Sequence, residues 1–255
     1  MVMKDTGAVL SKVPAVTLGF WIIKVLCTTL GETGGDTLSM TYDLGYLVSS
    51  FIFIVPLIVL VWAQVRAKAY NPWLYWATII ASTTTGTTMA DFATRSLGIG
   101  YTGGSALLLA LVLASLFVWH RSQGTVSVNR IASAPAERFY WATITLSQTL
   151  GTALGDWAAD DGGFGYLGGA LLFGGALAAV AALHYYTRAS KVALFWAAFI
   201  LTRPLGATVG DFLDKPLDQG GLDFSRPVAS AVLAAAIVLL IVLLPQRAGE
   251  HPGDN

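Results

Sequence analysis

Residues 20–36 read FWIIKVLCTTLGETGGD, and this stretch contains the pattern that decides the fold. It combines an aromatic–Trp pair with a glycine ten residues after the Trp and an aspartate five residues after that glycine. The same offsets recur three more times along the chain. The four sets are Phe20-Trp21, Gly31 and Asp36; Tyr75-Trp76, Gly86 and Asp91; Tyr140-Trp141, Gly151 and Asp156; and Phe195-Trp196, Gly206 and Asp211. Such repetition predicts one structural unit present in four copies.

Each repeated set begins a pair of apolar stretches. Apolar runs of about 20 residues are long enough to cross the hydrocarbon core of a bilayer. The sequence contains eight, at residues 13–35, 44–65, 73–91, 100–119, 138–156, 165–186, 192–211 and 226–245. Because each unit holds two spans, all units have the same orientation. We therefore expect an all-α polytopic membrane bundle of eight transmembrane helices, built as four parallel two-helix repeats with pseudo-fourfold or nested twofold symmetry.

The predicted organisation is a single membrane domain over residues 1–255. The repeats cover residues 13–68, 72–121, 137–188 and 191–246, and a central cytoplasmic loop covers residues 121–137. The first span is not expected to be a cleaved signal peptide, because Lys24 interrupts its apolar run and no small-residue cleavage site follows it.

The composition supports a membrane protein and excludes several other classes. Hydrophobic residues make up 55% of the chain and charged residues 12%, about half the usual share in a soluble domain. The mean hydropathy is +0.65. Lysine and arginine balance aspartate and glutamate, so no nucleic-acid partner is expected; the expected partners are the lipid bilayer and a small ion or small-molecule substrate. With one cysteine, three scattered histidines and no nucleophile–base pair or phosphate loop, the sequence does not predict an enzyme.

Charge in the loops predicts the orientation. The basic residues on the side of the termini are Lys4, Lys12, Arg66, Lys68, Arg121, Arg130, Arg138, Arg188, Lys191 and Arg247, whereas the opposite side holds Arg95, Lys215 and Arg226. The positive-inside rule then places both termini in the cytoplasm of a cell whose inner membrane holds the protein. The four repeated tryptophans lie toward the cytoplasmic ends of their spans. There they fit an interfacial aromatic belt, with stacking on a substrate as the alternative.

The motifs GETGGD (31–36), TTMAD (87–91), TALGD (152–156) and ATVGD (207–211), with their upstream tryptophans, carry a family resemblance. The chain resembles a bacterial integral-membrane family built from four copies of a repeat of unknown function. The resemblance covers nearly all of residues 13–245 and implies the membrane topology, but it implies no reaction.

Polar residues follow the repeat inside the odd-numbered spans. Seven residues after each Trp stand Thr28, Thr83, Gln148 and Arg203, and eleven residues after it stand Glu32, Thr87, Thr152 and Ala207. Steps of four keep to one helix face, so these residues and the four motif aspartates form a stripe on each odd helix. Lys24 extends the first stripe by one turn. If the four odd helices surround an axis, the stripes line it in layers.

Each element of this pattern also has a purely structural interpretation. The glycines, spaced four residues from another small residue, let helices approach closely. The aspartates can be solvated span ends or helix caps. Arg203 and Lys24 are too costly to leave unpaired and are expected to pair with Glu32 or a motif aspartate. The threonines can return hydrogen bonds to carbonyls four residues earlier. Pro204 predicts a kink in the seventh span.

The functional interpretation uses the same side chains. Several carboxylates together with hydroxyl and amide oxygens suit a hard cation such as Mg²⁺, Mn²⁺ or Ca²⁺, or protons. The sequence thus predicts a secondary transporter or channel for a small cation, with a divalent metal ion as the one cofactor to consider. The metal ligands expected are Asp36, Asp91, Asp156, Asp211 and Glu32. The wider site adds Thr28, Thr87, Gln148, Thr152, Arg203 and Lys24. Two alternatives are a non-transporting metal-binding scaffold or assembly factor, and a transporter of a small organic anion held by Arg203 and Lys24.

Overall fold

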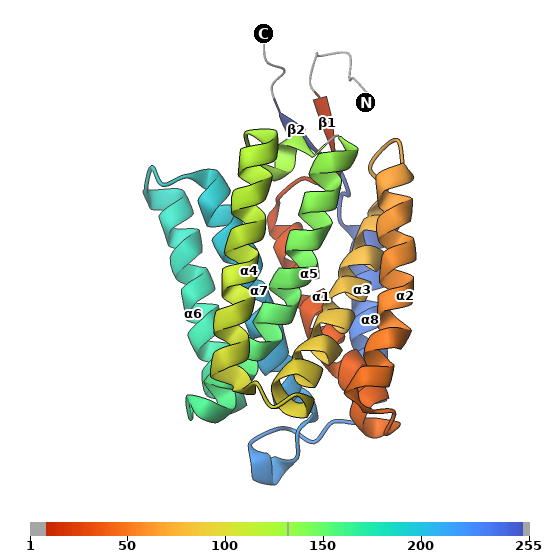
Figure 1. The fold of residues 1–255 in the computed structure, drawn as a ribbon, viewed down its shortest axis with the longest axis vertical. Helices are drawn as coiled ribbons and strands as arrows, with labels where there is room; N and C mark the ends of the chain where they lie inside the picture. Colours follow the sequence, from red (N-terminus) through yellow and green to blue (C-terminus); the bar gives the residue numbers. More distant parts are fainter. Residues whose placement is uncertain (1–8, 132, 252–255) are drawn as a thin grey trace.

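A computed structural model of the protein describes residues 9–131 and 133–251. Within these residues, eight long helices lie side by side along the long axis of the molecule (Figure 1). They are α1 (Leu18–Asp36), α2 (Gly45–Arg66), α3 (Pro72–Asp91), α4 (Gly100–Gln123), α5 (Ala134–Asp156), α6 (Gly165–Tyr186), α7 (Lys191–Asp214) and α8 (Arg226–Leu243). The expectation of an all-helical protein is confirmed.

Local capping sets helix starts that differ from the predicted spans. The first helix begins at Leu18, because Thr17 caps it by accepting a hydrogen bond from the backbone N–H of Phe20. The central loop is shorter than residues 121–137. Helix α4 continues to Gln123, and Ser133 caps α5 by accepting a hydrogen bond from the backbone N–H of Ala136. A short 3₁₀ turn, Val128–Arg130, lies in this loop.

Four helices form an inner ring. Helix α1 packs against α3 and α7, and α5 packs against the same two helices. The even-numbered helices cover this ring from outside, and each covers the next repeat rather than its own. Helix α2 packs on α3, α4 on α5, α6 on α7, and α8 returns to α1. The two helices of a repeat therefore do not pack together as a compact hairpin. Instead, the outer helix of each repeat packs on the inner helix of the next repeat.

With the exception of α7, the inner helices are less apolar than the outer helices. Five helices, α2, α4, α6, α7 and α8, are long and apolar enough to cross a membrane by length and composition. Helices α1, α3 and α5 do not reach that hydropathy, because they carry the polar stripes. Those stripes are buried inside the ring: Thr83, Gln148 and Thr152, for example, are fully buried.

The turn from an inner to an outer helix has the same form in three of the four repeats. A five-residue π-helical turn follows the motif aspartate at Thr37–Thr41, Phe92–Ser96 and Trp157–Asp161. The next helix then starts at Gly45, Gly100 or Gly165, each with a positive φ that favours glycine. In the fourth repeat α7 continues to Asp214, and the 3₁₀ turn Leu217–Gln219 precedes α8.

The glycines of the motif allow the close approach of the inner helices. A Cβ atom on Gly86 would lie 2.9 Å from the backbone carbon of Gln148, and one on Gly35 would lie 3.0 Å from Thr87 Cβ. Gly31 faces Thr83 and Gly206 faces Thr28 in the same way. Each glycine thus faces the next repeat around the ring, which confirms the predicted packing role.

A small sheet joins the two ends of the described chain. Strands β1 (Val9–Pro14) and β2 (Ala248–His251) pair antiparallel at one end of the bundle (Figure 1). Ser11 Oγ donates a hydrogen bond to the carbonyl of Val128, and Lys12 Nζ lies 2.5 Å from Glu137 Oε1. The helical spacing of the sequence gives no signal for this sheet.

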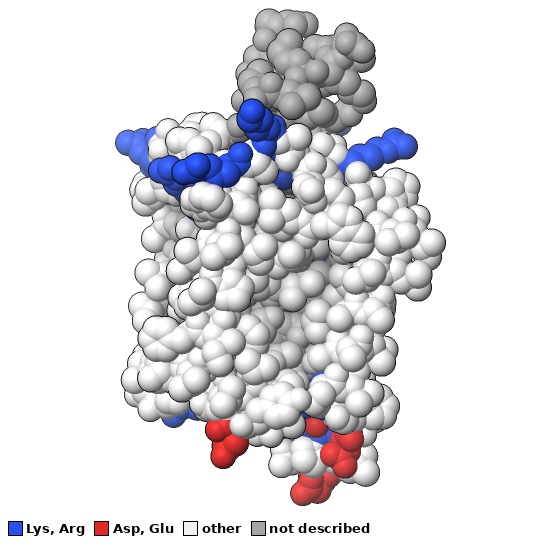
Figure 2. Space-filling model, turned by 90° about the vertical axis from the view of Figure 1, so that its right-hand side faces the viewer, with Lys and Arg blue, Asp and Glu red and all other residues white. Residues whose placement is uncertain are grey.

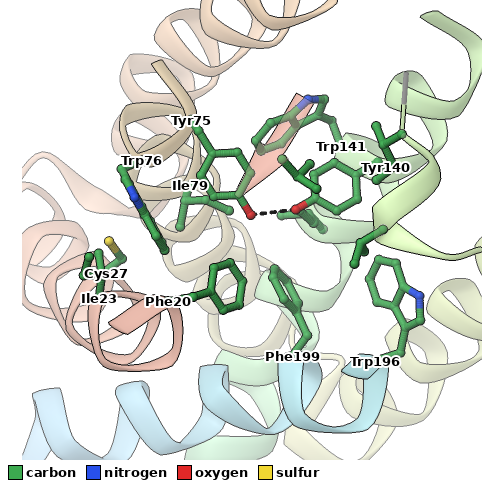
Figure 3. Close-up of a cluster of buried hydrophobic side chains, with 14 of the residues drawn as sticks. Phe20, Ile23, Cys27, Tyr75, Trp76, Ile79, Tyr140, Trp141, Trp196 and Phe199 are labelled. Carbon is green, nitrogen blue, oxygen red and sulfur yellow. Dashed lines mark hydrogen bonds between the residues drawn. The ribbon is translucent and has the colours of Figure 1, made fainter. Parts of the chain in front are cut away.

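Aromatic side chains fill the inner ring near that sheet. Figure 3 shows Tyr75 and Tyr140 pointing toward one another, with 2.6 Å between their hydroxyl oxygens. Trp76, Trp141 and Trp196 are at most 4% exposed. The expected interfacial belt is therefore wrong for these three tryptophans. Trp196 packs edge-on against Trp119 of the outer helix α4, and Trp76 Nε1 donates a hydrogen bond to Gln246 Oε1 on the C-terminal segment.

The surface separates the charges by sign. In the view of Figure 2, lysine and arginine gather at the end that carries the sheet, and aspartate and glutamate gather at the opposite end. A broad uncharged belt lies between them. Residues 1–8, with Lys4, and residues 252–255 fall outside the described part of the chain.

Candidate functional site

The four motif aspartates are buried at the acidic end of the inner ring. The exposed fraction is 1% for Asp36 and Asp91 and 2% for Asp156 and Asp211. Each stands at or near the end of an inner helix, where the helix turns toward the outer layer. The interpretation of these residues as solvated span ends is therefore wrong.

Two basic side chains tie the aspartates together in pairs. Arg95 Nε lies 3.1 Å from Asp91 Oδ1, and Arg95 Nη2 lies 3.3 Å from Asp156 Oδ2. Lys215 Nζ lies 2.8 Å from Asp211 Oδ1 and 3.0 Å from Asp36 Oδ2. Each basic residue thus links two neighbouring repeats of the ring.

Sequence reasoning missed this role and placed Arg95 and Lys215 in outer loops. The available signal was their spacing, because each follows a motif aspartate by four residues. That spacing puts the two side chains on one helical face. Lys215 lies just beyond α7. Burial alone would lower its pKa, but Asp211, Asp36 and Asp214 outweigh that effect and raise the pKa of Lys215 well above its ordinary value.

One turn deeper, a single guanidinium organises the next layer. Arg203 is fully buried, and its Nη2 donates to Glu32 Oε2 at 2.8 Å. The same nitrogen lies 2.6 Å from Thr87 Oγ1 and 2.5 Å from Thr152 Oγ1. The predicted pairing of Arg203 with Glu32 is confirmed. The guanidinium thus contacts Glu32, Thr87 and Thr152, which occupy equivalent positions in the first three repeats. The fourth repeat has Ala207 at this position.

Three of the five predicted metal ligands come together. Glu32, Asp36 and Asp211 each offer a carboxylate oxygen, and these oxygens all lie within 4.8 Å of one another. Asp91 and Asp156 are not in this group, because they share Arg95 on the other side of the ring. The expected ring of equivalent carboxylates is therefore divided into a triad and a pair.

The acidic end keeps an excess of negative charge. Asp214 joins the cluster, with Oδ1 3.4 Å from Arg226 Nε, and Arg226 also lies 3.9 Å from Asp36. Six carboxylates (Glu32, Asp36, Asp91, Asp156, Asp211 and Asp214) thus face four basic side chains (Arg95, Arg203, Lys215 and Arg226). Two formal negative charges remain when all of these groups are ionised.

The remaining predicted site residues lie deeper in the ring. Thr28 Oγ1 donates to the carbonyls of Val25 and Thr202, so its hydroxyl already has partners within the protein. Gln148 is fully buried, and neither atom of its amide has a hydrogen-bond partner within the described part of the chain.

Lys24 does not pair with a carboxylate among the described residues, so that expectation is wrong. Its Nζ lies 3.4 Å from Thr202 Oγ1 and 4.2 Å from the centre of the Phe199 ring. Glu32 is two turns further along α1, where it is held by Arg203.

The four repeated units match a known protein family. The family model described as Repeat of Unknown Function (DUF347) matches residues 19–70, 74–125, 139–190 and 194–247. The chain belongs to the DUF347 family. No curated protein and no solved structure gives a significant match to it.

The four DUF347 copies coincide with the structural units. Each match contains one inner helix and the outer helix that follows it. The backbone and the motif aspartate repeat four times, but the other buried charged side chains do not. Arg203 occurs in the fourth copy and Glu32 in the first, at positions where other copies carry threonine, glutamine or alanine.

Proposed function

We propose that all eight helices cross a membrane as four parallel two-helix repeats around a pseudo-fourfold axis. The closed ring of inner helices and the uncharged belt on the face shown in Figure 2 support this topology. We further propose that the basic end, with both termini, faces the cytoplasm across the inner membrane, because basic residues favour that side. The acidic end then faces outward and concentrates cations.

The proposed activity is the binding and movement of a small cation, with no enzymatic reaction. One observation carries it, the convergence of buried carboxylate oxygens from Glu32, Asp36 and Asp211 within 4.8 Å of one another. Carboxylates are hard oxygen ligands and suit Mg²⁺, Mn²⁺ or Ca²⁺ better than a soft metal. The two surplus negative charges of this buried cluster match one divalent ion. Ionisable groups inside a membrane bundle are costly, which favours a functional role for them.

The ammonium group of Lys215 competes with a metal ion for this site. Its ammonium lies between Asp36 and Asp211, the same two carboxylates that a metal ion would use. A divalent ion entering from the acidic end therefore displaces Lys215 and takes over its contacts. The lysine keeps the carboxylates compensated between binding events, because an isolated buried charge is unfavourable.

A second function, binding of a metal ion without its transport, is favoured by one specific observation. The aromatic cluster of Tyr75, Tyr140 and Phe199 packs across the inner ring between the polar layers and the sheet end. A scaffold that only holds a metal ion needs no opening there, whereas a transporter must open this cluster.

The test is a metal analysis followed by two measurements on the same preparation. Purified protein is assayed for bound divalent metals, and Mn²⁺ binding is then measured at equilibrium and as uptake into proteoliposomes. We expect saturable binding near one ion per chain together with uptake. Binding without uptake supports the scaffold, and the absence of binding rejects both functions.

A further inference from the structure

Lys24 is a buried basic residue of the bundle without a carboxylate partner among the described residues. It is fully buried, and no carboxylate of the described residues lies within salt-bridge distance of its Nζ. Its contacts are one long hydrogen bond to Thr202 and the face of the Phe199 ring. A cation–π contact recovers only part of the cost of burying an ammonium group.

Other buried polar groups in the adjoining layer also lack partners. Both amide atoms of Gln148, the hydroxyl of Thr83, and Nε and Nη1 of Arg203 make no hydrogen bond to any residue that the structure describes. All three residues are fully buried. Buried polar groups are normally satisfied, so several orphans in one layer point to a missing partner.

These groups share one side of their helices. Thr83 and Gln148 each stand four residues before a threonine that contacts the Arg203 guanidinium, namely Thr87 and Thr152. Residues four apart lie on the same helix face, so both side chains lie one turn below that contact, Thr83 against Gly31 of α1 and Gln148 against Gly86 of α3. Lys24 stands four residues before Thr28 on α1, one further turn away from the acidic end.

The chemistry of this layer selects an anion. Lys24, the free N–H groups of Arg203, the Gln148 amide nitrogen and the Thr83 hydroxyl are all hydrogen-bond donors. The charge of Arg203 is already matched by Glu32, whereas that of Lys24 is not. The region therefore has one uncompensated positive charge.

We propose that the ring binds one small monoanion, a halide or a small carboxylate, between Lys24 and the unpaired face of Arg203. The site lies on the side of Arg203 away from the Glu32–Asp36–Asp211 triad. It goes beyond the proposed cation site and does not depend on it. Lys24 supplies the charge, and Gln148 and Thr83 supply neutral hydrogen bonds.

The experiment measures binding of radiolabelled chloride, and separately of acetate, to the purified full chain in detergent. Buffers contain a chelator, so that divalent cations play no part and the outcome is separate from that of the cation site. The variants are Lys24→Met, which keeps the stem and removes the charge, and Gln148→Leu. Lys68→Met, at an exposed lysine, is the matched control.

We expect the wild type and Lys68→Met to bind one of the two anions near one per chain. Lys24→Met and Gln148→Leu should bind it about tenfold more weakly or worse, which corresponds to losing one hydrogen bond or charge-assisted contact. Lys24→Met removes an unpaired buried charge, so it is expected to fold, and Gln148→Leu provides the test if it does not. Wild-type protein that binds neither anion, or two folded variants that bind like the wild type, would overturn the proposal.

Discussion

Lys215 is the counterpart of Arg95 in the second half of the chain. The two residues are 120 positions apart, and each follows its motif aspartate by four residues. Arg95 links Asp91 to Asp156, and Lys215 links Asp211 to Asp36. The backbone ring and its motif aspartates repeat four times, but the basic residue that links two aspartates repeats only twice. The ion pairs that link the motif aspartates thus have approximate twofold symmetry, whereas the helices have approximate fourfold symmetry.

The first prediction concerns the stability contributed by Lys215. Replacing it in Lys215→Gln leaves two buried carboxylates without this partner, so the free energy of unfolding should fall by about 3–5 kcal/mol. The folded-state pKa of Lys215 is raised, so its stabilising effect is complete below the ordinary lysine pKa of about 10.4 and declines only as pH rises through the higher folded value. The gap between wild type and variant should therefore stay constant from about pH 7 to 9.

Chemical unfolding in detergent at several pH values measures this gap. Lys68→Gln, at an exposed lysine, serves as the control and should match the wild type. A gap that closes between neutral pH and about pH 9 would show that Lys215 is not held as a charged partner.

The second prediction concerns the pair Arg203 and Glu32. Arg203→Leu should lower the free energy of unfolding by about 3–5 kcal/mol, because Glu32 is left buried and charged without its partner. The double variant Arg203→Leu/Glu32→Leu removes both charges and should recover most of that loss. Unfolding of the four proteins of this cycle gives the coupling free energy. Additive losses would show that the pair is not coupled.

The third prediction separates packing glycines from incidental ones. Gly86→Ala should destabilise the protein by about 1–3 kcal/mol, because its Cβ would lie 2.9 Å from backbone atoms of α5, which cannot move aside like a side chain. Gly34→Ala is the control within the inner ring, since nothing lies within 4 Å of the added Cβ. It should stabilise α1 by up to about 1 kcal/mol through helix propensity. Equal effects in thermal unfolding would contradict the close-packed ring.

The fourth prediction tests the topology in a nearly natural background. The single cysteine, Cys27, is buried, so it should not react with a membrane-impermeant thiol reagent. In intact cells Asp161→Cys should be labelled from outside, whereas Ser122→Cys should be labelled only after the membrane is opened. Both positions are exposed and lie at opposite ends of the bundle. Labelling in the reverse order would invert the proposed orientation.

The sequence was sufficient for the helices and for the deepest charge pair. Apolar runs of fixed length and the repeated Trp, Gly and Asp offsets predicted eight helices in four units. A carboxylate partner for Arg203, either Glu32 or a motif aspartate, followed from the cost of burying a guanidinium alone, and the structure selects Glu32. Helix periodicity shows which face is buried but not which helix covers it. The packing of α2 on α3, and of α8 on α1, was therefore not predictable.

The errors in the candidate site have similar causes. Asp36 and its equivalents occur at helix ends, where exposure is common, and their burial depends on Arg95 and Lys215 turning back over them. Lys24 was expected to find a carboxylate because its cost demands compensation. Glu32 lies two turns away along α1 and is already paired with Arg203. The sheet of β1 and β2 joins residues too far apart in the chain for any local pattern.

The measurement that tests the central claim most directly compares Asp36→Asn with Asp43→Asn. Asn removes a carboxylate charge and nearly keeps its shape. Asp36 belongs to the triad, whereas Asp43 is an exposed residue of the neighbouring turn. Equilibrium binding of Mn²⁺ to folded, purified protein, with uptake in proteoliposomes, is measured for both variants and the wild type. We predict that Asp36→Asn binds the ion at least about tenfold more weakly and that Asp43→Asn is unchanged. Folded Asp36→Asn protein that binds Mn²⁺ as tightly as the wild type does would contradict the account.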